Sequence, residues 1–128
     1  MTPFTLRIPG LPPSTNNAFA SVGNRRVLSK DAKSFKDLVR WTILADRHNP
    51  KPKFKGPVEV SLTFYSQKWL TSAGKPRRID LGNLEKLACD AVFEALGLDD
   101  SSIWKLTLRK LDGPEESVIR ITPLDGAP

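Results

Sequence analysis

Residues able to do chemistry are concentrated between positions 80 and 100. Asp80 stands at the start of a segment with helical spacing, and Asp99 and Asp100 follow that segment in a turn. Inside the segment the polar residues recur at intervals of three and four, which places them on one stripe of an otherwise apolar helix: Asn83, Lys86, Asp90 and Glu94. The pattern therefore predicts that several carboxylates and a lysine meet at one place.

This set of side chains suits the hydrolysis of a phosphodiester. Mg²⁺ binds carboxylate oxygens and water, and it both activates a water molecule and neutralises charge on the phosphate. A lysine adds charge stabilisation at the phosphate. The candidates for metal binding and catalysis are four aspartates and one lysine: Asp80, Asp90, Asp99, Asp100 and Lys86.

The same residues also have ordinary structural interpretations, which composition and spacing alone favour slightly. Asp80 suits an N-cap, because aspartate often caps helices. Asp90 and Lys86 lie four residues apart and suit a surface ion pair worth only about 0.3 kcal/mol. Asp99 and Asp100 suit an ordinary turn. The alignment of the few polar residues along an apolar helix is the observation in favour of a site.

The elements that position these residues follow from hydrophobic spacing. Alternation predicts strands at 4–8, 58–64, 104–109 and 118–121, and Gly113-Pro114 indicates a hairpin between the last two. Helical spacing predicts helices from about Lys30 to Arg47, with Ser29 as N-cap, and over 84–96, with Gly97 as the stop. Residues 14–28 are expected to form a loop or short hairpin, and residues 67–78 a basic loop. The order β-α-β-α-β-β predicts an α/β fold with a mixed sheet.

The chain length and its 39% of hydrophobic residues suit one domain over residues 1–128. The net charge of +6 favours a polyanionic partner. Cys89 and His48 are the single cysteine and histidine, so an internal disulfide, a multi-cysteine zinc site and serine–histidine–aspartate chemistry are disfavoured. No apolar run approaches the roughly 20 residues of a membrane span, and no signal-peptide pattern begins the chain. We therefore expect a cytoplasmic protein with no membrane partner.

Three separated motifs resemble the signature of the RusA family of Holliday junction resolvases. Residues 80–86 (DLGNLEK) resemble its Asp-x-Asp-Asn-x-x-Lys motif, residues 89–92 (CDAV) its Asp-Ala pair, and residues 98–100 (LDD) its Asp-Asp turn. Residues 12–17 (PPSTNN) resemble its Pro-Pro-Ser-x-Asn stretch after the first strand, and residues 27–29 with the following helix fit its next element. The resemblance covers about the whole chain in the same order.

This resemblance implies a homodimeric mixed α/β fold, dependence on Mg²⁺ or Mn²⁺, and paired nicks across a four-way DNA junction. By motif position, Asp80 matches the first catalytic aspartate, Lys86 the catalytic lysine and Asp100 the aspartate of the turn. The second aspartate of the first motif is Gly82 here, so the metal loses one carboxylate. Either Asp90, Asp99 or Glu85 compensates, or catalysis is weak, or the chain is an inactive binder.

Gly82→Asp is accordingly expected to raise Mg²⁺-dependent cleavage. In an extended lead into the helix, side chains at 80 and 82 point to the same side. An added aspartate would then complete the site beside Asp80.

Candidate DNA-contacting residues are mainly basic or amide side chains, because such groups hold the phosphate backbone. Trp69 lies in the basic loop and is expected to stack on unpaired bases, whereas Trp41, Trp104 and Cys89 are expected in or beside the core. Asn16 and Asn17 also suit a turn, and Arg25 and Arg26 suit solvated charge. The full set is Asn16, Asn17, Arg25, Arg26, Lys68, Trp69, Lys75, Arg77, Arg78 and Asn83.

The interpretation that explains most of these residues is a homodimeric, Mg²⁺-dependent endodeoxyribonuclease that resolves four-way junctions. A dimer is expected because two symmetric cuts need two equivalent sites. A rival is a non-catalytic or weakly catalytic protein that binds branched DNA, which Gly82 favours. A general basic nucleic-acid-binding module would leave the acidic residues unexplained.

Overall fold

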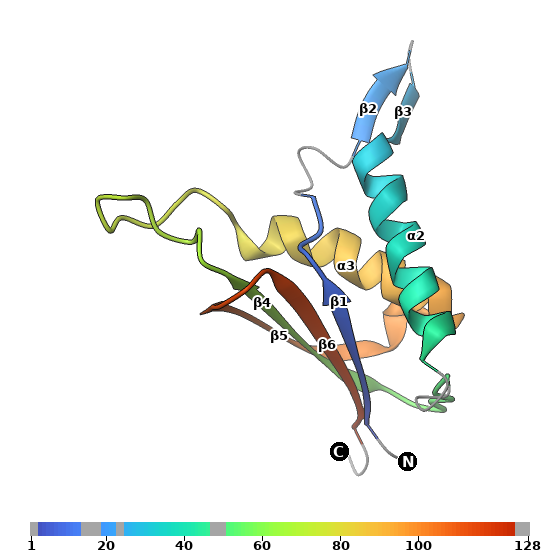
Figure 1. Ribbon diagram of the computed structural model, residues 1–128. Coiled ribbons are helices and arrows are strands. Elements are labelled where there is room, and N and C mark those ends of the chain that lie inside the picture. Colours follow the sequence, from blue (N-terminus) through green and yellow to red (C-terminus); the bar gives the residue numbers. More distant parts are fainter. Residues whose placement is uncertain (1–2, 14–18, 23–24, 47–50, 125–128) are drawn as a thin grey trace.

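A mixed sheet covered by two helices positions the acidic residues (Figure 1). The computed structural model describes residues 3–13, 19–22, 25–46 and 51–124, and for 19–22 and 25–28 the backbone alone. In chain order the elements are β1 (Phe4–Pro9), β2 (Phe19–Val22), β3 (Arg25–Leu28), α2 (Lys30–Ala45), β4 (Val58–Ser66), α3 (Leu81–Leu96), the 3₁₀ turn η1 (Asp100–Ser102), β5 (Ile103–Asp112) and β6 (Glu116–Pro123).

The main sheet has the strand order β1-β6-β4-β5, and β2 and β3 pair separately as a small antiparallel ribbon. β4 and β5 run parallel, joined by α3, whereas β6 runs antiparallel to both β4 and β1. The predicted α/β class with a mixed sheet and two main helices is confirmed. The ribbon β2–β3 extends the predicted order and realises the short hairpin that was one of the two expectations for residues 14–28.

The predicted hairpin between the last two strands is wrong. β5 and β6 lie on opposite sides of β4, so they make no ladder with each other. The intervening turn crosses the end of β4, where the backbone N–H of Gly113 donates to the carbonyl of Ser66 at 3.3 Å. A Cβ at position 113 would stand 3.4 Å from the Tyr65 ring, and Gly113 has φ +154°. Glycine at this turn thus reflects a tight crossing.

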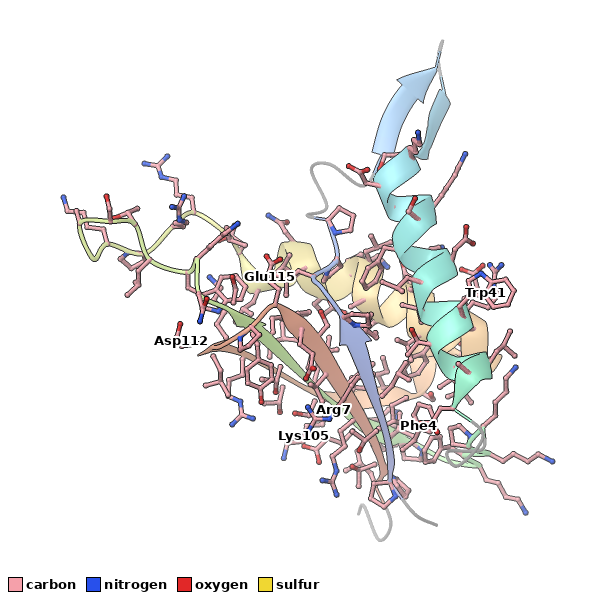
Figure 2. All side chains as sticks on the ribbon, viewed as in Figure 1. Phe4, Arg7, Trp41, Lys105, Asp112 and Glu115 are labelled. Atoms are coloured by element: carbon pink, nitrogen blue, oxygen red, sulfur yellow. The ribbon has the colours of Figure 1, made fainter. Side chains whose placement is uncertain are left out.

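One apolar core lies between the sheet and the helices. Alternate residues of the strands point into it, among them Leu6, Val60, Leu62 and Ile119, as period-2 burial requires. The helices add stripes at helical spacing, which in α2 consist of Ala32, Phe35, Val39 and Ile43. Both helices therefore cover the same face of the sheet, and the opposite face carries polar side chains such as Arg7 (Figures 1 and 2).

Both helix boundaries have the chemistry expected of them. The Ser29 hydroxyl accepts a hydrogen bond from the backbone N–H of Ala32 at 3.2 Å, which confirms the predicted N-cap of α2. α3 ends at Gly97, whose φ of 69° lies in the left-handed region, and the N–H of Leu98 donates back to the carbonyl of Phe93 at 2.9 Å. This sharp stop turns the chain back along the helix, toward the start of β5.

Two tryptophan predictions are wrong. Trp41 is 68% exposed and Trp104 is 66% exposed, although both were expected in the core. Trp41 follows the buried Val39 by two positions, which carries it off the core stripe of α2 and out into solvent (Figure 2). Trp104 sits where the register of β5 shifts against β4 on the edge strand of the sheet.

Candidate active site

A pocket between α3 and the start of β5 collects several of the residues singled out from the sequence. Its lining is mixed, with carboxylates and a lysine from the helix and turn and mainly apolar side chains from the strand. The lining residues are Glu85, Lys86, Cys89, Asp90, Asp100, Ile103, Trp104, Lys105 and Leu106. Three of the predicted site residues are thus brought together.

The local sequence explains this gathering. Glu85 and Cys89, and likewise Lys86 and Asp90, are four residues apart and therefore neighbours on one side of α3. Asp100 reaches the same side because the chain reverses at Gly97 and enters η1. Asp99 caps η1 by accepting a hydrogen bond from the N–H of Ser101 at 2.9 Å. The turn therefore uses one aspartate to build its own structure and leaves the next to line the pocket.

Cys89 reports on the electrostatics of the pocket. Burial raises the pKa of its thiol far above its usual range, and the negative charges of Glu85, Asp90 and Asp100 raise it further. The thiol also donates a hydrogen bond to the Glu85 carboxylate. Cys89 is buried, as the sequence predicted, and its thiol is protonated at neutral pH. The carboxylates of Glu85, Asp90 and Asp100 therefore all interact electrostatically with the Cys89 thiol.

Lys86 and Asp90 form the ion pair that their spacing indicated, with Nζ and Oδ1 3.6 Å apart. The lysine side chain is 63% exposed, so the pair is screened by water. Lys86 consequently keeps access to an anion that approaches the mouth of the pocket.

Asp80 stands apart from this cluster. It occupies the N-cap position of α3, yet its side chain makes no capping hydrogen bond, so the capping interpretation is realised in position only. Ten residues separate it from Asp90, about 15 Å along the axis at 1.5 Å per residue. Asp80 is therefore not a member of the pocket that Asp90 and Asp100 line.

Asp99 does not line this pocket. It lines a neighbouring hollow that also includes Lys36, Glu94, Asp90 and Asp100. Hydrogen bonds from Ser101, first from the backbone and then from the side chain, hold the pKa of the Asp99 carboxyl below its usual range. Asp99 thus combines a structural role with a position next to the candidate site.

Gly82 lies inside the first turn of α3, not in an extended lead. The expectation that side chains at 80 and 82 share one side of an extended segment is therefore wrong. Gly82 does not have positive φ, and a Cβ built on it would meet nothing within 4 Å. Position 82 is one turn before Glu85 and Lys86, so a side chain there would emerge near the pocket face of the helix.

Carboxylate oxygens are the donors that Mg²⁺ prefers, and the pocket presents three of them. Among residues 3–13, 19–22, 25–46 and 51–124, however, no three acidic, histidine or cysteine side chains stand in a metal-coordinating arrangement. The pocket therefore suits a hard divalent cation by donor chemistry, without a preformed coordination sphere in the described part of the chain.

The basic loop, residues 67–78, precedes the N-terminus of α3 (Figure 1). Lys68, Lys75, Arg77 and Arg78 are all exposed on it. The backbone of the loop is hydrogen-bonded, with Thr71 N–H donating to the carbonyl of Lys75 at 2.7 Å and Arg77 N–H to that of Trp69 at 2.9 Å. The loop is thus an ordered cationic projection.

Trp69 anchors this loop. Its indole N–H donates to the carbonyl of Leu111 at 2.8 Å, and its half-buried ring packs against the core. The Lys110 ammonium lies 5.1 Å from the ring centroid, within the range of a cation–π contact. These contacts give Trp69 a structural role, while its stacking on DNA remains a prediction.

The other predicted DNA contacts are only partly placed. Asn83 lies half-buried in the first turn of α3, and its N–H donates to the carbonyl of Asp80 at 3.1 Å. Asn16 and Asn17, and the side chains of Arg25 and Arg26, lie outside the described part of the chain. Sequence reasoning missed Trp104, Lys105 and Leu106 as pocket residues, because alternation alone does not show that a strand lies at the sheet edge.

The fold and the pocket together define a small mixed α/β domain with a carboxylate-lined site beside a cationic loop, a combination suited to cutting a polyanion. The family model described as endodeoxyribonuclease RusA matches residues 9–122. The chain belongs to this family of endodeoxyribonucleases. No curated protein sequence matches it significantly. No helix in the described ranges has both the length and the apolar character needed to cross a membrane.

Proposed function

We propose that this protein is a divalent-metal-dependent endodeoxyribonuclease that binds four-way DNA junctions as a homodimer and resolves them by paired nicks. The observation that carries the proposal is the joint lining of one pocket by Lys86, Asp90 and Asp100 in a chain of the RusA family. The basic loop supports it, because exposed Lys and Arg side chains bind phosphates without regard to base sequence.

We assign the metal to this pocket, with Asp90 and Asp100 as ligands. Mg²⁺, or Mn²⁺ in its place, would supply Lewis acidity and an activated water there. Lys86 would break its ion pair with Asp90 and neutralise charge on the scissile phosphate. Asp80, at the N-terminus of α3, would face the DNA strand that is bound by the basic loop. Asp99 would hold the turn that carries Asp100. The loop cations Lys68, Lys75, Arg77 and Arg78 would bind the flanking backbone.

A dimer follows from the proposed reaction, since symmetric cuts across a junction need two equivalent sites. The exposed apolar residues of α2 support it, because Trp41 is 68% and Leu44 56% exposed on one helix. Such residues are candidates for burial against a second copy. Sedimentation at micromolar concentration tests this point, and a monomer both with and without DNA would contradict it.

A non-catalytic binder of branched DNA is the second candidate, and Gly82 is the observation that favours it. A site short of one carboxylate would keep the cationic surface that binds DNA and lose the chemistry. Metal-dependent nicking separates the two candidates, while both require a preference for branched over linear DNA.

The deciding experiment is incubation of a synthetic four-way junction with the protein in Mg²⁺, in Mn²⁺ and in chelator. A linear duplex of equal length serves as the control substrate. We expect paired nicks in either metal, none in chelator and little cleavage of the duplex. Tight junction binding without nicks in either metal would replace the enzyme by the binder, and equal affinity for both DNAs would refute junction recognition.

A further inference from the structure

A run of alternating lysines, residues 51–55 (KPKFK), lies between α2 and β4 and is called the lysine segment below. Lys51, Lys53 and Lys55 are exposed, whereas Pro52 and Phe54 are half-buried. Phe54 packs against the apolar core, and the ring of Pro52 restricts the backbone at its own position and at the residue before it. The segment therefore has one side anchored on the core and one cationic side.

The cations of the lysine segment have no acidic partners in the described part of the chain. None of its three lysines takes part in a salt bridge between described residues. The lysines of the candidate active site differ, because Lys86 lies 3.6 Å from Asp90 and Lys105 lies 3.2 Å from Glu59. Three like charges within five residues repel one another, so an approaching polyanion stabilises the segment by neutralising them.

The lysine segment is linked to the candidate active site by a groove across α3. The pocket beside β5 shares Asp90 and Asp100 with the neighbouring hollow. That hollow shares Lys36 and Glu94 with a third hollow, which Lys51 also lines. Because consecutive hollows have walls in common, they form one continuous path from the pocket to Lys51.

The charge of this groove becomes positive toward the lysine segment. Lys36 donates a hydrogen bond of 2.8 Å to Glu94, and this contact holds the pKa of the Glu94 carboxyl below its usual range. Among the described residues, three cations (Lys36, Arg40 and Lys51) and one carboxylate (Glu94) line the end of the groove. A chain of phosphates that leaves the pocket along the groove therefore meets uncompensated positive charge.

The lysine segment and the basic loop lie at opposite ends of α3 (Figure 1). The basic loop precedes Leu81, where the helix begins, whereas Lys51 shares its hollow with Ala91 and Ala95 in the C-terminal half of the helix. The helix has 16 residues and is about 24 Å long at 1.5 Å per residue. Its residues 85–90 line the pocket, so cations stand on both sides of the candidate active site.

We propose that the lysine segment binds backbone phosphates of DNA on the side of the cleaved bond away from the basic loop, so that the cleaved strand is held at both ends. This role rests on the proposed function, because it takes the pocket as the point of cleavage. Exposed ammonium groups recognise phosphates without regard to base sequence. The segment therefore fixes the path of the strand and adds no sequence preference.

Methylphosphonate interference locates these contacts without any cleavage. Single uncharged methylphosphonates replace successive phosphates in one strand of a synthetic four-way junction, and a gel-shift titration in chelator measures the affinity for each substrate. With the wild-type protein, substitution on either side of the nick position should weaken binding. Lys51→Gln/Lys53→Gln should abolish this sensitivity on one side, and Lys75→Gln/Arg78→Gln should abolish it on the other.

Two further variants separate a phosphate contact from a general effect of charge. Lys51→Gln/Lys53→Gln should reduce the slope of log affinity against log salt by about 2, or about 1 for each lysine. Lys51→Arg/Lys53→Arg keeps the charge and should retain both the slope and the two-sided interference. The matched control Arg7→Gln/Arg120→Gln removes two exposed cations from the open face of the sheet and should also retain the two-sided interference.

Unchanged interference in Lys51→Gln/Lys53→Gln, or its loss on the same side as in the loop variant, overturns the proposal. An equal loss in the control variant overturns it as well. A protein that nicks junctions, and whose two-sided interference survives Lys51→Gln/Lys53→Gln, would retain the proposed function and refute the role of the segment. A protein that loses one side of the interference in this variant, yet nicks in neither metal, would retain the DNA contact and refute the enzyme.

Discussion

The pocket beside α3 and the basic loop before it concentrate opposite charges by opposite means. The pocket places Glu85, Asp90 and Asp100 around a buried thiol, where burial and like charge act together. The basic loop keeps its cations exposed and takes its shape from backbone hydrogen bonds and from Trp69. We therefore expect the chemistry of the pocket to depend on single side chains, whereas DNA binding by the loop should depend on the sum of its charges.

This contrast implies that chemistry and DNA binding can be altered separately. Exposed cations bind phosphates by releasing counterions, a term that adds up over contacts. A metal-binding pocket depends on each ligand, because a missing oxygen changes both affinity and reactivity. The predictions below test this separation in order of decreasing expected effect.

Asp100→Asn should lower junction cleavage by at least about 100-fold, since even groups outside the ligand shell contribute 10- to 100-fold. Binding of the junction should be unchanged, because the basic loop is intact. Single-turnover cleavage and a gel-shift titration measure the two quantities. Asp37→Asn, which makes the same charge change on α2 away from the pocket, is the control. Equal cleavage rates for both variants would contradict the assignment of Asp100 to the active site.

Lys75→Ala/Arg78→Ala should weaken junction binding, and it should reduce the slope of log affinity against log salt by about 2, or about 1 for each phosphate contact. The cleavage rate at saturating protein should stay the same. The matched control is Arg7→Ala/Arg120→Ala, which removes two exposed cations from the open face of the sheet. An identical change of slope in both double variants would show that the loop has no special part in binding.

Trp69→Phe should lower the free energy of unfolding by about 1 kcal/mol, because the indole N–H no longer satisfies the carbonyl of Leu111. Urea denaturation measures this effect. Trp41→Phe, at a site 68% exposed, should change stability by less than about 0.5 kcal/mol. If Trp69→Phe proves neutral for stability but weakens binding of unpaired DNA, the residue acts by stacking and the anchoring role is wrong.

Gly82→Asp in the otherwise unchanged protein should have the smallest effect on cleavage, a rise in the Mg²⁺-dependent rate of less than about tenfold, or 1.4 kcal/mol. The position is sterically open and lies in a helical first turn, where negative charge is favourable. The gain is small because Glu85 already contributes a carboxylate to the pocket. A gain of several hundredfold in initial cleavage rate would indicate that the pocket had lacked an essential ligand.

Local patterns predicted the elements well where one periodicity dominated. Ser29, Gly97 and the apolar stripe of α3 placed the helices within a few residues of their observed bounds. The same patterns failed for Trp41 and Trp104, since an apolar residue at roughly helical or alternating spacing is not thereby directed to the core. They also failed at Gly113, where the residues of a turn do not reveal which strands the turn connects.

The candidate site was predicted in residue type more than in arrangement. Lys86, Asp90 and Asp100 were expected together and line one pocket. Asp80 was expected with them but lies at the N-cap of α3 and does not line that pocket. Glu85 was one of three candidates to replace the missing carboxylate. It lines the pocket together with Asp100 because η1 lies against the helix.

The sequence by itself determined the class of fold, the helix boundaries, the burial of Cys89 and the family signature, because these depend on spacing and capping within short segments. The tertiary structure alone decided that β4 separates β5 from β6, that Trp104 is exposed at the sheet edge, and that Glu85, Asp90 and Asp100 share one pocket. These features depend on how distant segments pack, and short-range periodicity carries no information about which segments become neighbours in space.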